Sequence, residues 1–179
     1  MSMQLQDKQR IAILSAYALA LHGFEAMLPS PIPWLRLGLA NIITLTALVL
    51  FGFRTAIMIT LIRVMLGSVF AGTFLGPSFL LSLGGGIAGT CAMGVMLGVS
   101  RKLFGPVGLS LVGALFHNAT QLFLAYLLFI QRIEAVLIIS PVVLLIGTVT
   151  GFANGIIADI LIKNLLKKEE DSIHNVAPA

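Results

Sequence analysis

Long apolar runs separated by short polar breaks fill most of the chain. A run of about 20 apolar residues is long enough to cross the hydrocarbon core of a bilayer as one helix. The second and third runs are separated only by Gly52, Phe53 and Arg54, which predicts a tight helical hairpin. The pattern predicts an all-α, polytopic membrane protein with about six transmembrane helices, at residues 11–28, 36–53, 55–72, 78–99, 107–130 and 135–163.

The segments outside these runs differ from them in character. Residues 1–10 are polar, and because no small-residue cleavage site follows the first run, we expect an uncleaved first helix. Pro29, Pro31 and Pro33 break the chain after it and favour an extended path. Residues 164–179 are charged and then small and polar, so we expect a disordered tail. The domain organisation is therefore a short N-terminus, one membrane domain over residues 11–163, and a tail.

Composition supports the membrane assignment. The chain is 58% hydrophobic and 10% charged, whereas a soluble domain has about 25% charged residues. The mean hydropathy is +1.04. The net charge of +4 comes from residues scattered at helix ends, so it does not indicate a nucleic-acid partner. A single cysteine, Cys91, excludes an internal disulfide.

The basic residues also predict an orientation. With the N-terminus in the cytoplasm, eight of the 11 lysines and arginines fall on the inner side and two on the outer side, with one inside a helix. Such a bias follows the positive-inside rule. We therefore expect both termini in the cytoplasm. The inner residues are Lys8, Arg10, Arg54, Arg101, Lys102, Lys163, Lys167 and Lys168; the outer ones are Arg36 and Arg132; Arg63 lies within a helix.

Three polar residues interrupt the fifth run, at 107–130. His117 and Gln121 are four residues apart and share one helical face, while Asn118 lies about 100° round the helix. Polar side chains at this depth are costly unless they face protein or water. They are therefore candidates for binding a ligand.

Two charged residues and one amide extend this candidate set. Arg63 lies at the centre of the third run, Glu25 near the outer end of the first, and Asn41 at the start of the second, on the outer side. Arg63 has two compatible interpretations. It forms a structural ion pair with Glu25, or it receives an anionic substrate group, because guanidinium suits carboxylate and phosphate geometry.

Together these residues predict a substrate pocket. Six polar groups at compatible depths favour one binding site over six unrelated buried polar residues. The candidates for substrate binding are Glu25, Asn41, Arg63, His117, Asn118 and Gln121. No nucleophile elbow, metal-ligand spacing or aspartate-rich motif is present in the sequence, so we expect neither a catalytic site nor a metal or other cofactor.

A glycine-rich segment matches the dinucleotide fingerprint only in form. Residues 84–89 contain G-x-G-x-x-G. That fingerprint requires a strand before it and a helix after it in a soluble unit, whereas here it lies inside an apolar run. Close packing of neighbouring helices, or a bent helix beside the pocket, is the better interpretation.

The first run carries a stripe of small residues. Ala12, Ala16 and Ala20 are spaced four apart, which lets another helix approach closely. The stripe predicts either internal packing or a docking face for a partner subunit in the membrane.

Several blocks of the sequence resemble a known family. They are Glu25-x-x-x-Pro29-x-Pro31, Leu37-Gly38-Leu39-Ala40-Asn41, Leu61-Ile62-Arg63-x-x-Leu66-Gly67, Ser82-Leu83-Gly84-Gly85 and Gly113-Ala114-x-x-His117-Asn118-x-x-Gln121. Over about residues 11–160 the chain resembles the bacterial family labelled heptaprenyl diphosphate synthase component I, also called the Gx transporter family.

This resemblance implies a fold and a function. The family is grouped with the S-components of energy-coupling-factor (ECF) transporters, six-helix proteins of the bacterial inner membrane with an outward-facing pocket. Those proteins dock onto a transmembrane coupling subunit, energised by ATPases, through an Ala-x-x-x-Ala face that Ala12, Ala16 and Ala20 match. The resemblance implies uptake of a small molecule, with membrane lipid around the chain. The alternative is a non-catalytic membrane partner in polyprenyl diphosphate or quinone synthesis, as the family label suggests; a purely structural assembly subunit is a third class.

Overall fold

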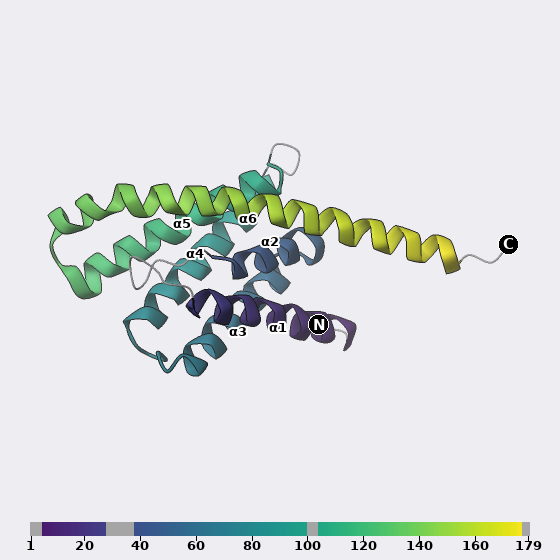
Figure 1. The fold of residues 1–179 in the computed structure, drawn as a ribbon, viewed down its shortest axis with the longest axis horizontal. Helices are drawn as coiled ribbons and strands as arrows, with labels where there is room; N and C mark the ends of the chain where they lie inside the picture. The colour runs from purple at the N-terminus through teal and green to yellow at the C-terminus, as the bar shows by residue number, and fades with distance from the viewer. Residues whose placement is uncertain (1–4, 28–37, 100–103, 177–179) are drawn as a thin grey trace.

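The computed structural model of the chain describes residues 5–27, 38–99 and 104–176 (Figure 1). These described residues form six α-helices and one π-helical turn, joined by turns and short loops, and contain no strand. The all-α prediction is therefore confirmed. The elements are α1 (Leu5–Met27), α2 (Ala40–Phe51), α3 (Phe53–Phe70), α4 (Pro77–Val99), α5 (Pro106–Ala125), the π-helical turn η1 (Tyr126–Ile130) and α6 (Ile133–Val176).

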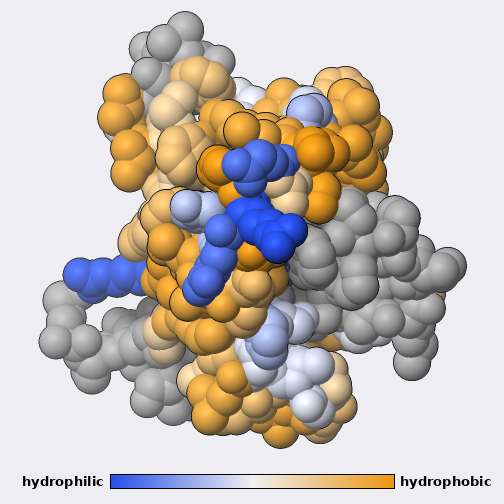
Figure 2. Space-filling view, turned by 90° about the vertical axis from the view of Figure 1, so that its left-hand side faces the viewer, coloured by the Kyte–Doolittle hydropathy of each residue, from blue (hydrophilic) through white to orange (hydrophobic). Residues whose placement is uncertain are grey.

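Four of the helical segments are apolar and long enough to cross a membrane: Phe53–Phe70, Pro77–Val99, Pro106–Ile130 and Ile133–Lys167. Large apolar side chains are exposed along all four. Figure 2 shows the same property on one face of the molecule, where hydrophobic residues cover most of the coloured surface around a small group of hydrophilic ones. A surface of this kind suits lipid, and the chain is a multi-pass membrane protein.

Helix α2 differs from the predicted segment 36–53, because it is too short to cross a membrane by itself. Its 12 residues span about 18 Å at 1.5 Å per residue, against a hydrocarbon core of roughly 30 Å. Gly38, with φ +72°, forms the turn before the helix, and its carbonyl accepts the Asn41 N–H at 2.8 Å. Only Gly52, at φ +86°, separates α2 from α3, so the predicted hairpin is confirmed.

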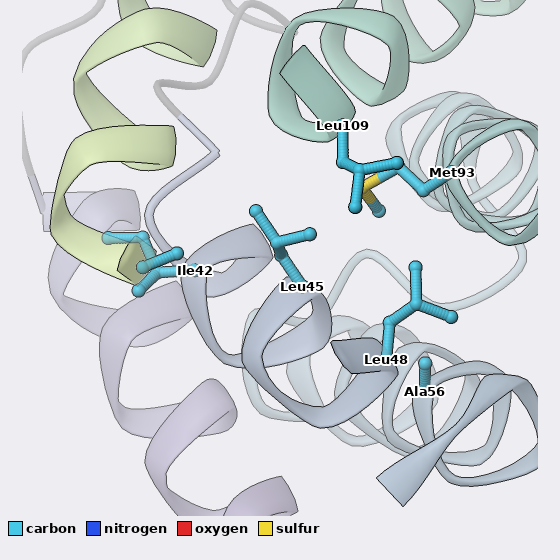
Figure 3. Packing of buried hydrophobic residues seen from close by; sticks show 7 residues of the cluster. Ile42, Leu45, Leu48, Ala56, Met93 and Leu109 are labelled. Carbon is cyan, nitrogen blue, oxygen red and sulfur yellow. The ribbon is translucent and has the colours of Figure 1, made fainter. Parts of the chain in front are cut away.

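Because α2 is short, it lies within the bundle as a core helix. Every residue from Ile42 to Leu48 is buried. Its side chains meet Met93 of α4 and Leu109 of α5 in one apolar cluster (Figure 3). A second cluster joins α2 to α1 and α3, through Ala18, Ala40, Ile43, Ala47, Ile59 and Ile11. A helix that is apolar all round is stable only where other elements cover every side.

Helix α6 is longer than the predicted segment 135–163. It continues as one helix through Val176, whereas we expected disorder from residue 164 onwards. The residues beyond 163 are rich in the helix-forming types Leu, Lys and Glu. One ion pair between side chains four apart, Lys163 Nζ to Asp159 at 2.6 Å, supports this part of the helix. Figure 1 shows α6 projecting past the other helices toward the C-terminus.

A proline lies inside α6 without ending it. Pro141 has no N–H to donate to the carbonyl of Leu137, four residues earlier. The hydroxyl of Ser140 donates to that same carbonyl at 3.1 Å. The neighbouring side chain therefore supplies the hydrogen bond that the proline removes.

Helices α5 and α6 approach closely along a line of glycines in α6, spaced four residues apart. A Cβ at Gly151 would lie 2.7 Å from the Cβ of Ala114, and one at Gly155 would lie 2.7 Å from the Cα of Val107. A Cβ at Gly147 would meet the side chain of Asn118. We call these three glycines the α6 glycine line. Small residues at such spacing let the helix backbones of membrane proteins pack tightly.

We predict that Gly155→Ala destabilises the protein, because the backbone atom of Val107 cannot move aside as a flexible side chain would. Overpacking of this kind costs about 1–3 kcal/mol. Gly98→Ala is the matched control, since nothing lies within 4 Å of the position its Cβ would take. The check is the melting temperature of both variants in detergent. Equal melting temperatures would contradict the prediction, because they would show that α5 and α6 can move apart without loss of stability.

Candidate functional site

Three consecutive glycines place α4 between α3 and α5. A Cβ at Gly86 would lie 3.0 Å from a methyl group of Thr60 on α3. A Cβ at Gly85 would lie 3.0 Å from both Nδ1 of His117 and Cγ of Gln121 on α5. The interpretation of this segment as a close helix contact is therefore confirmed. The glycines remove side-chain bulk at the level where the polar residues of α3 and α5 lie.

Three of the predicted site residues come together beside this contact. Arg63 is 6% exposed and Gln121 is 4% exposed, while His117 is half-buried. Arg63 adjoins Val64, which with Thr60 lies against Gly86, the residue that follows Gly85. His117 and Gln121 both lie against Gly85, as their four-residue spacing predicts. We call Arg63, His117 and Gln121 the Arg63 cluster.

Asn118 lies on a different side of α5. Its amide packs against Gly147 of α6, whereas His117 faces α4. Asn118 is only 5% exposed, so the seam between α5 and α6 encloses it. An offset of about 100° between neighbouring residues is enough to separate the two side chains once helices cover both sides of α5. The structure therefore does not bring Asn118 into the Arg63 cluster.

Asn41 lies level with Arg63 in the α2–α3 hairpin. Asn41 precedes Gly52 by 11 residues, and Arg63 follows Gly52 by 11. The hydroxyls of Thr44 and Thr60 lie 3.5 Å apart and confirm this register of the two helices. Asn41 is half-buried at the first turn of α2. The structure therefore places Asn41 level with Arg63, while its expected position on the outer side of the membrane stays a prediction.

Buried threonines link the helices just below this level. The hydroxyl of Thr60 lies 3.0 Å from that of Thr90 on α4, in addition to its long contact with Thr44. All three threonines are buried. Sequence analysis did not single them out, although each is a polar residue inside an apolar run. Their hydroxyl groups serve as hydrogen-bond partners for one another where α2, α3 and α4 meet.

Asn154 is a buried polar residue outside the predicted substrate-binding set. It is 5% exposed, and its Nδ2 donates to the carbonyl of Gly38 at 3.2 Å, across 116 residues of sequence. It lies between two glycines of the α6 glycine line. The bond joins α6 to the turn that begins α2.

Glu25 falls in α1, but its side chain lies outside the described residues. The predicted ion pair between Glu25 and Arg63 therefore stays a prediction.

A small polar hollow lies between α3 and α4, beyond the Arg63 cluster toward the loop that joins these helices. Its volume is about 10 Å³, which is room for roughly one water molecule. Four of its seven lining residues carry a hydroxyl group. The lining residues are Val64, Gly67, Ser68, Thr73, Ser78, Phe79 and Ser82.

The alanine stripe of α1 is exposed at all three positions, Ala12, Ala16 and Ala20. The opposite face of α1 is the buried one, with Ile11, Ser15 and Ala18. Among the residues that the structure describes, the stripe is thus not used for packing. It remains accessible to another helix.

The Arg63 cluster has the chemistry of an anion-binding group. Guanidinium donates up to five hydrogen bonds in a planar fork, and imidazole and carboxamide add neutral donors and acceptors. In the described ranges, no three His, Cys, Asp or Glu side chains are grouped so that they could hold a metal ion. The groups that do converge can bind a carboxylate or phosphate and fix its orientation.

The fold and the cluster define a class of protein: a multi-pass helical membrane protein with charged and polar side chains enclosed between its helices. The chain belongs to the heptaprenyl diphosphate synthase component I family, whose model matches residues 14–161. The family that the sequence blocks indicated is thereby confirmed. No curated protein matches the chain, and no solved structure matches it.

Proposed function

We propose that the chain is an integral membrane substrate-capture subunit, similar to the S-components of ECF transporters, for uptake of a small anionic molecule. The observation that carries this proposal is the burial of Arg63 on α3, at the level where His117 and Gln121 of α5 pack against α4. A charge near the bilayer centre costs roughly 2.5–3.5 kcal/mol on insertion scales. Intramembrane ionisable residues of this kind mark substrate pathways, and a bound anion would add charge-assisted hydrogen bonds.

The topology of this proposal has six membrane segments and both termini in the cytoplasm of a bacterial inner membrane. Four long apolar helices support four of these segments, while α2 enters the membrane domain as a short core helix. The distribution of basic residues supports the orientation. In this orientation the alanine stripe of α1 faces the membrane and is available to a transmembrane coupling subunit that ATPases energise.

A second candidate function is a non-catalytic membrane partner in polyprenyl diphosphate or quinone synthesis. The family description favours it. It needs an exposed contact surface, which the alanine stripe also provides. It gives no role to the buried Arg63. Co-purification separates the two, because the first predicts a coupling subunit with ATPases and the second a prenyl synthase.

We predict that Arg63→Gln removes an anion that the wild-type protein retains through gentle purification, as measured by native mass spectrometry. Losing a hydrogen bond to a charged group costs about 1.5–3 kcal/mol, and losing a neutral one about 0.5–1.5 kcal/mol. Arg63→Gln should therefore lower occupancy more than Gln121→Leu does.

The control for these variants is Thr148→Val, because Thr148 is exposed and bonds only the carbonyl of Leu144 in its own helix. Melting temperatures accompany each measurement. If Arg63→Gln and His117→Ala both keep wild-type occupancy while melting earlier, the Arg63 cluster is a structural network and the binding proposal is wrong.

We predict that Ala16→Trp prevents co-purification of the coupling subunit, because an indole on the stripe blocks close approach of a second helix. Ala153→Trp is the matched control, on an exposed position of α6. The melting temperature of the isolated subunit should not change. A variant that no longer folds would assign the stripe to packing within the chain.

We predict that a membrane-impermeant maleimide labels Glu134→Cys in intact cells and labels Gly105→Cys only after permeabilisation. Both positions are exposed, at opposite ends of the α5–η1 segment. The background is Cys91→Ser, which removes the native thiol. Labelling in the reverse pattern would place both termini outside and overturn the orientation.

A further inference from the structure

The start of α2 is held from outside its own segment. Asn154 of α6 donates from Nδ2 to the carbonyl of Gly38 at 3.2 Å. The same carbonyl accepts the backbone N–H of Asn41 at 2.8 Å. Gly38 has φ +72°, a backbone conformation that glycine adopts at little cost. The carbonyl oxygen of Gly38 therefore links the turn to both the first turn of α2 and helix α6.

This bond lies where irregular backbone is hardest to accommodate. Non-helical backbone inside a membrane domain is tolerated only where protein or a water-filled cavity surrounds it. Asn154 is 5% exposed and Ala40, the first residue of α2, is fully buried. The amide of Asn154 thus gives a polar partner to a turn that apolar helices enclose.

On the other side, the α6 glycine line fixes Asn154 to α5. Gly151 and Gly155, on either side of Asn154, pack against Ala114 and Val107 of α5. Helix α5 carries His117 and Gln121. Helices α5 and α6 therefore form one packed pair, and Asn154 is the residue of that pair that reaches the turn at Gly38.

The α2–α3 hairpin carries the other half of the candidate site. Gly52 alone joins the two helices, and the hydroxyl contact of Thr44 with Thr60 fixes their register. Asn41 and Arg63 are level in this hairpin. A shift of the start of α2 along its axis would move both residues relative to His117.

We infer that Asn154 is a positioning residue: its hydrogen bond to Gly38 holds the α2–α3 hairpin, with Asn41 and Arg63, in register with the α5–α6 pair, with His117 and Gln121. This inference rests on the proposed function for its effect on binding. The hydrogen bond itself is independent of that function. Asn154 does not need to touch the ligand to set the ligand's affinity.

The test uses Asn154→Leu, which keeps the size of the side chain and removes the donor, and Asn154→Gln, which keeps a donor. Asn154→Ala replaces the leucine variant if that variant does not fold. Thr148→Val is the control on the same helix, since its hydroxyl bonds only within α6. Each protein is reconstituted in nanodiscs as the full chain.

The first measurement is hydrogen exchange of the amides of Asn41 and Ile42, whose acceptors lie in the turn at Gly38 and Leu39. Asn154→Leu should speed exchange there and leave residues 90–93 of α4 unchanged. Asn154→Gln should restore slow exchange. Unchanged exchange in Asn154→Leu would overturn the inference, because the bond would then not hold the start of α2.

The second measurement is thermal stabilisation by inorganic phosphate, pyrophosphate and citrate, fitted to an apparent affinity. Asn154→Leu should weaken it by roughly two- to tenfold, the range for one lost neutral hydrogen bond. Faster exchange with wild-type affinity would make the bond purely structural and refute the positioning role. If no probe stabilises the wild type, the proposed function and the positioning role fail together, while the exchange data still decide whether Asn154 holds α2.

Discussion

The structure depends on enclosing one short apolar helix, α2, inside a bundle of longer ones. Residues 42–48 of α2 are buried on every side, against α1 and α3 on one face and against Met93 and Leu109 on another. Apolar packing drives this enclosure only if the polar groups at the helix ends also find partners, because lipid offers none. The Gly38 turn, with its bond from Asn154, meets that requirement at one end.

Enclosing α2 also explains where the polar side chains gather. Close helix contacts need small residues, so glycines lie where α4 meets α3 and α5, and where α6 meets α5. Arg63, His117 and Gln121 lie beside the first of these contacts, and Asn118 lies in the second. The glycine contacts therefore decide which polar residues lie near one another. The helical period decides that His117 faces α4 while its neighbour Asn118 faces α6.

The sequence predicted the features that depend on composition along the chain. Apolar runs predicted the helices, and the four-residue spacing of His117 and Gln121 predicted their shared face. It could not predict the length of α2, because the largely apolar run 36–53 continues across Gly38, whose positive φ forms the turn before the helix. Nor could it separate Asn118 from His117, since that depends on which helices lie on each side of α5. The partner of Asn154 could not be predicted either, because it is a backbone carbonyl 116 residues away.

The two candidate functions make different use of the same chain. A membrane partner of an enzyme acts through its surface, and the exposed stripe of Ala12, Ala16 and Ala20 suits such a contact. That stripe suits a coupling subunit of a transporter equally well, so it does not discriminate. The interior bears on the choice, because Arg63 is 6% exposed at the level of the polar side chains of α5, and burying a guanidinium in a membrane domain has an electrostatic cost. A bound anion would offset that cost through charge-assisted hydrogen bonds. The proposal of substrate capture therefore depends on Arg63 more than on any surface feature.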